Sequence, residues 1–245
     1  MKLRGNLALV TGASRGIGRA IAENLVQNGC RVVITGRNSQ TLAQTAAEIG
    51  AIPRVHDAAD WGGAAETVEW AAAQLGGLDM VVNNAGLFAQ RSEWNRDELL
   101  RTTADEWRRV MDVNVSGVFF MMQAAVRHMK SHGVRGNVLN VTSVAGAEPI
   151  YGAYGASKIA ATGLTRGWGR MFAPDGIVIN GIAPGPVATE MNHWHPGDSM
   201  AHSRIPFGRY ASAEEVAQCV LYLLSPAAEM VCGETVILDG AYAVR

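Results

Sequence analysis

Short apolar runs alternate along the chain with longer segments of helical periodicity. Continuous apolar runs are typical of strands that are buried on both faces. Such runs lie at 7–11, 31–35, 80–83, 137–142, 177–182 and 236–239, with a weaker one at 54–56. Helices are predicted between them at 16–28, 42–49, 64–75, 105–132, 156–171 and 213–224. Strands and helices that alternate in this way predict an α/β fold, with a doubly wound parallel sheet and helices on both faces.

Two of the predicted helices begin with a capping box. Thr103 is followed three positions later by Glu106, and Ser212 is followed in the same way by Glu215. No repeat, low-complexity tract or charged linker divides the 245 residues, so we expect a single domain over 1–245.

Composition argues against several classes of protein. Hydrophobic residues make up 48% of the chain and charged residues 18%, which is typical of a globular domain. Lys and Arg total 21 and Asp and Glu 22, so the net charge of −1 argues against nucleic acid or a membrane as partner. No apolar run approaches the roughly 20 residues that span a bilayer. Three scattered cysteines and no signal-peptide pattern predict a cytoplasmic protein.

A glycine-rich turn joins the first predicted strand to the first helix. Residues 7–18 read LALVTGASRGIG, with Gly12, Gly16 and Gly18 in the turn. Glycines there permit a tight turn, close approach to a pyrophosphate and close packing of helix on strand. The helix N-terminus adds free N–H groups and a partial positive charge. The pattern predicts a dinucleotide site, and its alternative is a structural turn without a ligand.

The end of the second strand bears on which dinucleotide binds. An acidic residue there would accept hydrogen bonds from the ribose hydroxyls and favour NAD. The segment 34–38 has no acid, and its Arg37 can bind a 2′-phosphate with Arg15 as a second positive charge. NADP(H) is therefore the predicted cofactor, with NAD less favoured. The alternative is that the arginines are solvated surface charges.

Tyr154 and Lys158 stand four positions apart at the start of a predicted helix. Side chains at this spacing share one helix face, so the ammonium can lower the pKa of the phenol from about 10. Such a tyrosine can donate or accept a proton at a carbonyl or alcohol oxygen. The spacing also arises by chance, and the surrounding motifs decide between the two interpretations.

Together these motifs resemble those of the short-chain dehydrogenase/reductase family, in its compact single-domain branch. The resemblance extends from about residue 3 to about residue 242. It rests on TGxxxGIG at 11–18, NNAG at 83–86, Asn114, Ser143, Tyr154 with Lys158, and Pro184-Gly185 with Thr189. The resemblance implies a Rossmann-type sheet of about seven strands and an NAD(P)-dependent oxidoreductase acting on CH–OH and C=O groups.

The family also implies a role for each catalytic position. Tyr154 is the acid in carbonyl reduction and the base in alcohol oxidation, and Lys158 lowers its pKa and bonds the nicotinamide ribose. Ser143 holds the substrate oxygen and stabilises the charge that develops on it. Asn114 anchors a water that links Lys158 to solvent, and its alternative is a bond to backbone inside its helix. Hydride transfer belongs to the cofactor, and no metal is required.

The residues implied to contact the cofactor come from all parts of the chain. They are Gly12, Ser14, Arg15, Gly16, Ile17, Gly18, Arg37, Asp57, Asn84, Ala85, Gly86, Tyr154, Lys158, Pro184, Gly185, Val187 and Thr189. Asp57 resembles the residue that touches adenine, with the cap of a turn as its alternative. Two rival hydroxyls are Tyr151, which lacks a lysine four positions on, and Thr142, which is expected to point away from the Ser143 side.

Substrate-facing segments are implied at 87–95, at 144–151 and in a loop near 187–207. Candidate walls of an apolar pocket are Trp94, Tyr151, Met191 and Trp194, and their alternative is packing beneath their own loops. His193, His195 and His202 stand in the last segment, but no cysteine or carboxylate accompanies them at metal-ligand spacing, so no metal site is predicted.

The substrate class is the least constrained expectation. Relatives that reduce 3-oxoacyl groups on acyl carrier protein tend to carry basic residues at two places, where this chain has Asp175 before Gly176 and Val134 before Arg135. We therefore expect a free small-molecule ketone or secondary alcohol, with 3-oxoacyl-[acyl-carrier-protein] reductase as the alternative. An NADP-sensing regulator on the same fold is the non-enzymatic alternative. An epimerase or dehydratase of the longer branch fits the chain length and glycine spacing poorly.

Family members usually form homotetramers through two long helices, here 105–132 and 156–171. The candidates for burial at that contact are Met121, Met122, Ala125, Trp168 and Met171, and their alternative is the core of one protomer.

Overall fold

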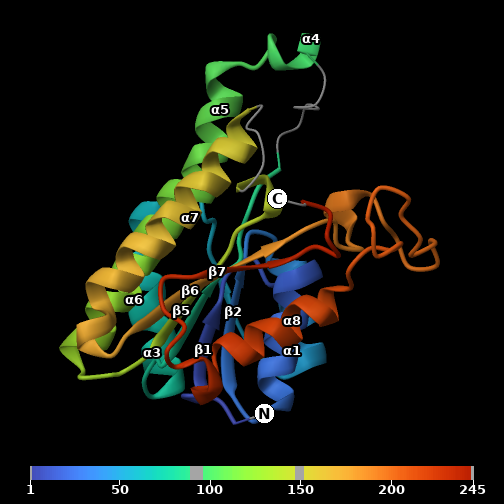
Figure 1. Ribbon diagram of the computed structural model, residues 1–245. Coiled ribbons are helices and arrows are strands. Elements are labelled where there is room, and N and C mark those ends of the chain that lie inside the picture. The colour runs from blue at the N-terminus through green and yellow to red at the C-terminus, as the bar shows by residue number, and fades with distance from the viewer. Residues whose placement is uncertain (1, 89–95, 147–151, 244–245) are drawn as a thin grey trace.

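The computed structural model describes residues 2–88, 96–146 and 152–243. They form a seven-stranded parallel sheet in the order β3-β2-β1-β4-β5-β6-β7 (Figure 1). The strands are β1 (Leu7–Val10), β2 (Arg31–Gly36), β3 (Ile52–Val55), β4 (Met80–Asn83), β5 (Asn137–Val141), β6 (Val178–Pro184) and β7 (Thr235–Leu238). The strand order reverses between β1 and β4, which confirms the predicted doubly wound α/β fold.

Helices cover both faces of this sheet. They are α1 (Gly16–Gln27), α2 (Ser39–Ile49), α3 (Ala64–Leu75), α4 (Arg96–Leu99), α5 (Ala104–Met111), α6 (Gly117–Ser131), α7 (Ala153–Phe172) and α8 (Ala213–Leu223). One core cluster contains α1, α2 and α8, and the other contains α3 and α6. In Figure 1, α1 and α8 lie to the right of the sheet, and α3, α6 and α7 lie to its left.

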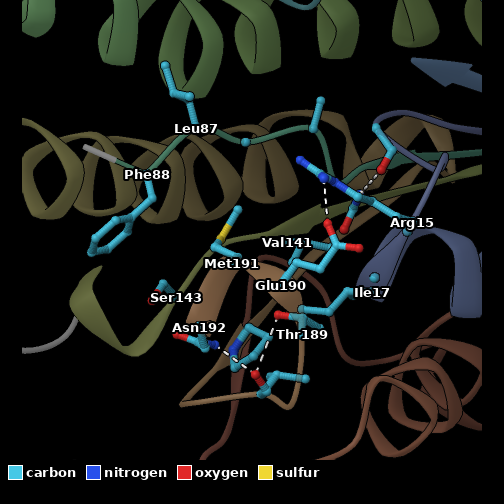
Figure 2. A pocket seen from close by; sticks show the side chains of 18 of the residues that line it. Arg15, Ile17, Leu87, Phe88, Val141, Ser143, Thr189, Glu190, Met191 and Asn192 are labelled. Carbon is cyan, nitrogen blue, oxygen red and sulfur yellow. Dashed lines mark hydrogen bonds and ion pairs between the residues drawn. The ribbon is translucent and has the colours of Figure 1, made fainter. Parts of the chain in front are cut away.

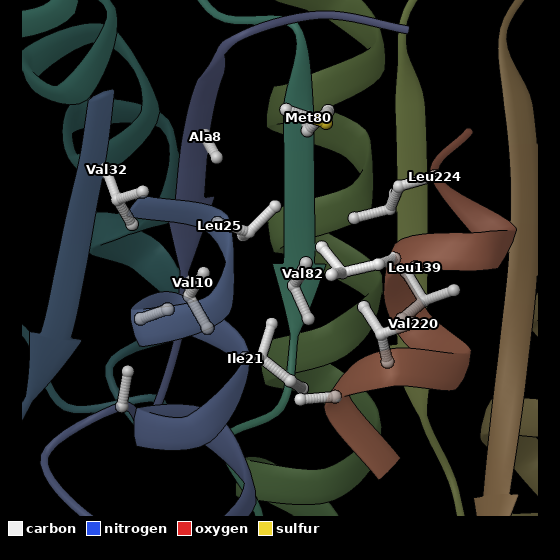
Figure 3. Close-up of a cluster of buried hydrophobic side chains, with 14 of the residues drawn as sticks. Ala8, Val10, Ile21, Leu25, Val32, Met80, Val82, Leu139, Val220 and Leu224 are labelled. Atoms are coloured by element: carbon white, nitrogen blue, oxygen red, sulfur yellow. The ribbon is translucent and has the colours of Figure 1, made fainter. Parts of the chain in front are cut away.

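The continuously apolar strands contribute side chains to both core clusters. Val10 and Val82 belong to the cluster with α1 and α8, whereas Leu9 and Val81 belong to the cluster with α3 and α6. Figure 3 shows Ile21 of α1 beside Val10 and Val82 over the first face. Successive side chains of a strand point to opposite faces, so a strand between two helix layers needs apolar residues at every position.

The helix predicted at 105–132 is interrupted, which corrects the sequence-based expectation. After α5, a π-helical turn (η2, Asp112–Ser116) precedes α6. The loop after β3 comes close to the chain at this point. A Cβ on Gly117 would stand only 2.5 Å from the Ala58 carbonyl oxygen. Apolar periodicity continues through a single π turn, so the pattern could not reveal the break.

Helix starts are set by local capping. Both predicted capping boxes are present, at Thr103 with Glu106 and at Ser212 with Glu215. Helix α2 begins three residues earlier than predicted, because the Asn38 side chain accepts a 2.9 Å hydrogen bond from the amide of Thr41. No helix in the described parts of the chain is long and apolar enough to cross a membrane.

The residues expected at a contact between protomers divide into two groups. Met121, Met122 and Ala125 are buried in the core of the protomer, so their assignment to the contact is wrong. Trp168 packs edge-on against Phe119, with ring centres 5.4 Å apart. Met171 is 69% exposed. The periodicity identified an apolar helix face correctly, but it could not distinguish burial against α3 from burial against another chain.

Candidate active site

A cavity of about 900 Å³ opens at the carboxyl ends of β1, β2, β4, β5 and β6. All the predicted site residues line it except Asn114, which is buried beside it. The place agrees with the rule that open α/β sheets bind ligands where the strand order reverses. Residues more than 100 positions apart in the sequence therefore share one concave surface.

The glycine turn is shaped by contacts within the protein as well as by access to a ligand. Gly12 has φ +63°, and a Cβ there would stand 2.6 Å from the Ala85 Cα. Gly18 is similarly crowded by the side chain of Asn84 and the carbonyl of Gly12. These glycines let the turn after β1 pack directly on the segment after β4, which places both on the cavity wall.

Asn84 and Thr11 hold these two segments together. The Asn84 side-chain amide donates hydrogen bonds of 2.9 Å to the carbonyls of Thr11 and Gly12. The Thr11 hydroxyl accepts bonds of 3.1 Å from the amides of Asn84 and Ala85. The side chain of Asn84 thus braces the turn. Thr11 was not among the predicted site residues, although its place at a strand end before Gly12 was a usable signal.

The N-terminus of α1 has no side-chain cap, a feature that it shares with the start of α7 at Gly152. Its N-cap residue, Arg15, makes no side-chain cap hydrogen bond. Asn38, Thr103 and Ser212 do cap their helices. Gly16 and Ile17 begin α1 on the cavity wall, so their backbone N–H groups are placed to meet an anionic group.

Lys158 and Tyr154 stand one helical turn apart in α7, on the cavity wall. The Lys158 ammonium lies 5.5 Å from the centre of the Tyr154 ring and donates a 3.1 Å hydrogen bond to the carbonyl of Val141. Burial lowers the pKa of Lys158 to about 8, because the charged form loses hydration. The Phe88 ring also packs against Tyr154, with the ring centres 4.7 Å apart.

Ser143 enters the cavity just beyond β5. Its hydroxyl accepts a 3.2 Å hydrogen bond from the amide of Ala145, and the residue is partly exposed. The neighbouring Thr142 is buried, and its hydroxyl donates to the Ile182 carbonyl at 3.0 Å. Tyr151, the rival phenol, lies outside the described residues. Of the two described hydroxyls, Ser143 is therefore the accessible one.

Asn114 does not line the cavity but forms hydrogen bonds to Leu87, which does, and to Ser157 in α7. Its carbonyl oxygen accepts a 2.8 Å bond from the amide of Leu87, and its side-chain amide donates to the Leu87 carbonyl at 2.9 Å. The same amide donates to the hydroxyl of Ser157 at 3.0 Å. These bonds join the π-helical turn to the segment after β4 and to α7. The side chain bonds backbone of another segment, rather than that of its own helix.

The far end of the cavity lies beside β2 and β3. Arg37 is exposed there, while the side chain of Asn38 is engaged as a helix cap. Asp57 lines the cavity and also accepts a 3.0 Å bond from the Ala59 amide, so it does brace a turn. His56 lines the same end and was not predicted, and burial lowers its pKa.

The segment after β6 forms the opposite wall. It contains a short 3-10 helix (η5, Glu190–Asn192), and Glu190 forms a 2.5 Å ion pair with Arg15 across the cavity (Figure 2). Met191 and Trp194 line the cavity as expected, together with Phe88. Trp94 lies outside the described residues. The described residues contain no cluster of three or more histidines, cysteines and carboxylates able to hold a metal.

These features fit a dinucleotide. An uncapped helix N-terminus offers N–H groups to a pyrophosphate. Arg37 offers positive charge at the end beside β2, and Arg15 is a second cation in the lining. The buried ammonium of Lys158 has three donors and gives one to Val141, so it can also bond a sugar hydroxyl. Phe88 supplies apolar wall beside Tyr154, and Met191 is a further apolar residue of the lining.

The chain is similar to known proteins over nearly its whole length. The family described as Enoyl-(Acyl carrier protein) reductase matches residues 12–243. Gluconate 5-dehydrogenase from Gluconobacter oxydans is 37% identical, covering 99% of this chain and 96% of that protein. The 3-oxoacyl-[acyl-carrier-protein] reductase from Thermotoga maritima is 35% identical, covering 100% of both. A solved short-chain dehydrogenase/reductase from Serratia marcescens has a TM-score of 0.87 at 32% identity, covering 100% of both chains.

Proposed function

The chain belongs to the short-chain dehydrogenase/reductase family of NAD(P)-dependent oxidoreductases, and we propose that it interconverts a ketone and a secondary alcohol with NADP(H) as cofactor. The proposal rests on the geometry of one pair of residues. The buried ammonium of Lys158 lies 5.5 Å from the Tyr154 ring, on the wall of a dinucleotide-sized cavity. A cation so close to a phenol favours the phenolate and makes Tyr154 a competent acid and base.

The cofactor would be held by groups along the whole cavity. The N-terminus of α1 would bind the pyrophosphate, Arg37 and Arg15 the 2′-phosphate, and Lys158 the ribose next to the nicotinamide. The remaining predicted contacts, among them Pro184, Gly185, Val187 and Thr189, would enclose the nicotinamide end. When bound, the nicotinamide supplies the hydride in reduction and accepts it in oxidation.

The residues of the chain would bind the substrate oxygen and transfer its proton. The Ser143 hydroxyl donates a hydrogen bond to the carbonyl oxygen and stabilises the negative charge that develops there. Tyr154 gives its proton to that oxygen as the carbonyl carbon gains hydride, and Lys158 stabilises the phenolate that remains. In alcohol oxidation the same proton returns to Tyr154. Asn114 holds Leu87 and Ser157, and a water anchored at Asn114 would return protons from solvent to Lys158.

A free small-molecule carbonyl is the favoured substrate class. Asp175 forms a 2.7 Å ion pair with Lys130, and Arg135 packs against Gly176, so an acid stands where an acidic carrier protein would need a free base. Gluconate 5-dehydrogenase, a relative at 37% identity, is named for a free sugar acid. The second candidate is 3-oxoacyl-[acyl-carrier-protein] reductase, which the Thermotoga relative favours.

We also propose a cytoplasmic homotetramer in which each protomer is one domain over 1–245. The contact would be formed by the helices at 105–132 and 156–171, where Trp107, Ile159 and Met171 remain exposed on the protomer. An apolar side chain of this size gains stability when a partner covers it.

Oxidation of NADPH, followed by absorbance, tests the reaction directly. The substrates are an acetoacetyl thioester, several free ketones and several diketones, and the matched blank is Tyr154→Phe. We expect turnover of free carbonyls that falls about 10²- to 10⁴-fold in the variant. Turnover only of the thioester would favour the carrier-protein reductase. Tight NADPH binding without turnover of any carbonyl would favour the regulator.

A further inference from the structure

Arg15 forms an ion pair with Glu190 of the same chain. Its guanidinium lies 2.5 Å from the Glu190 carboxylate, although the two residues are 175 positions apart in the sequence. Arg15 belongs to the glycine turn and Glu190 to η5, and both line the cavity. Figure 2 shows the carboxylate facing the guanidinium. The ion pair therefore spans the cavity in which a dinucleotide would lie.

Glu190 is held in this place by its own segment. The Asn192 side chain donates to the Val187 carbonyl at 2.8 Å, and the amide of Trp194 donates to the Thr189 carbonyl at 3.1 Å. The two walls also approach each other beside the pair, since a Cβ on Gly16 would stand 3.6 Å from the Thr189 methyl group. The meeting of Arg15 with Glu190 thus follows from the packing of two ordered segments.

Cationic side chains outnumber carboxylates in the lining of the cavity. The lining cations are Arg15, Arg37, Lys158 and Arg204, whereas the lining carboxylates are Asp57 and Glu190. Asp57 already accepts a backbone hydrogen bond, and Glu190 is the carboxylate paired with a cavity cation.

We infer that Glu190 determines how strongly the protein distinguishes NADP(H) from NAD(H), by competing with the 2′-phosphate for Arg15. This inference rests on the proposed NADP(H) dependence. A 2′-phosphate carries negative charge and attracts the same guanidinium that Glu190 holds. NADH has a hydroxyl at that position, so its binding leaves the ion pair undisturbed. Glu190 therefore weakens the binding of NADPH more than that of NADH.

The test is the dissociation constant of each cofactor, measured by isothermal titration calorimetry on the full chain. For Glu190→Gln we expect the dissociation constant for NADPH to fall by about two- to fivefold, the range set by an exposed ion pair. That for NADH should stay unchanged. The gain should vanish in 1 M salt, where exposed charges are screened. Weaker or unchanged NADPH binding would overturn the inference.

A second variant shows whether Glu190 acts through Arg15. In an Arg15→Met background, Glu190→Gln should leave the NADPH constant unchanged; a gain of the same size there would mean direct repulsion and would overturn the competition. The matched control is Glu48→Gln, which removes a carboxylate paired with Arg19 at 2.9 Å and lies outside the cavity lining. It should change neither constant, and a NADPH gain as large as that of Glu190→Gln would also overturn the inference.

Failure of the inference differs from failure of the proposed function. If the unmodified protein binds NADPH no better than NADH, and Arg37→Asp changes neither, the proposed cofactor preference is wrong. If NADPH is preferred and Arg37→Asp abolishes the preference, while Glu190→Gln leaves the ratio of the two constants unchanged, only the role of Glu190 is wrong.

Discussion

The side-chain amide of Asn114 donates a 3.0 Å hydrogen bond to the hydroxyl of Ser157, which in turn donates to the backbone carbonyl of Tyr154 at 2.7 Å. Through this relay, the π-helical turn reaches the first turn of α7. Asn114 and Ser157 are both buried. The place of Tyr154 in the cavity therefore depends on a residue that does not itself line the cavity.

Replacing Asn114 should loosen this arrangement. Asn114→Ala removes two bonds to Leu87 and one to Ser157, and it leaves buried polar groups unpaired. We expect the free energy of unfolding in urea to fall by about 1–3 kcal/mol, together with a loss of turnover. Ser157→Ala keeps both bonds to Leu87 and should cost less. Equal stability of the two variants would contradict the relay.

The buried ammonium of Lys158 should give a specific pH dependence of stability. Its folded pKa of about 8 lies below the usual 10.5, so between these values the unfolded chain binds more protons than the folded chain. The contribution of Lys158 to the free energy of unfolding should therefore rise by roughly 1–3 kcal/mol from pH 8 to 10.5 and be flat below pH 8. Lys158→Met should lack this rise, measured by denaturant titration of the cofactor-free protein. Lys130→Met, which removes an exposed lysine, should retain it.

Arg37 should control the preference between the two dinucleotides. Arg37→Asp replaces a cation at the β2 end of the cavity with a group that repels a phosphate and accepts bonds from ribose hydroxyls. We expect the dissociation constant for NADPH to rise by about 10- to 100-fold, and that for NADH to stay similar or fall. Calorimetry with both cofactors measures the ratio. An unchanged NADPH constant would mean that the 2′-phosphate binds elsewhere.

Gly12 should tolerate no side chain. Gly12→Ala combines a positive φ of +63° with a Cβ placed 2.6 Å from the Ala85 Cα. The matched control is Gly133→Ala, at φ +65°, where nothing lies within 4 Å of the new Cβ. The control should cost only the backbone strain of about 1–2 kcal/mol. Thermal unfolding should show a clearly larger loss for Gly12→Ala, with weaker NADPH binding; equal losses would contradict the close packing.

Met171 should report on assembly. This side chain is 69% exposed on α7, next to the contact proposed between protomers. Met171→Glu would place a charge in that contact and should shift a tetramer toward smaller species in light scattering after size-exclusion chromatography. Met230→Glu, at a methionine that is 94% exposed outside these helices, serves as the control. Identical masses for the two variants and the unmodified protein would exclude Met171 from the contact.

Local sequence patterns were enough to predict most of the helices and strands and most residues of the candidate site. Continuous apolar runs identified the strands, because a strand between two helix layers is apolar at every position. The glycine turn, the four-residue spacing of Tyr154 and Lys158, and the capping boxes at Thr103 and Ser212 are all local. Their meaning depends on neighbours within a few residues, which the sequence displays directly.

The way in which distant segments meet could not be predicted from these local patterns. The break at Asp112–Ser116 lies where the loop after β3 approaches, and Met121 is buried in the cluster that contains α3. The pairing of Arg15 with Glu190 requires two loops to face each other across the cavity. Periodicity records which face of an element is apolar. It carries no information about which other element, loop or charge that face will meet, because strand order and loop approach are set by the packing of the whole sheet.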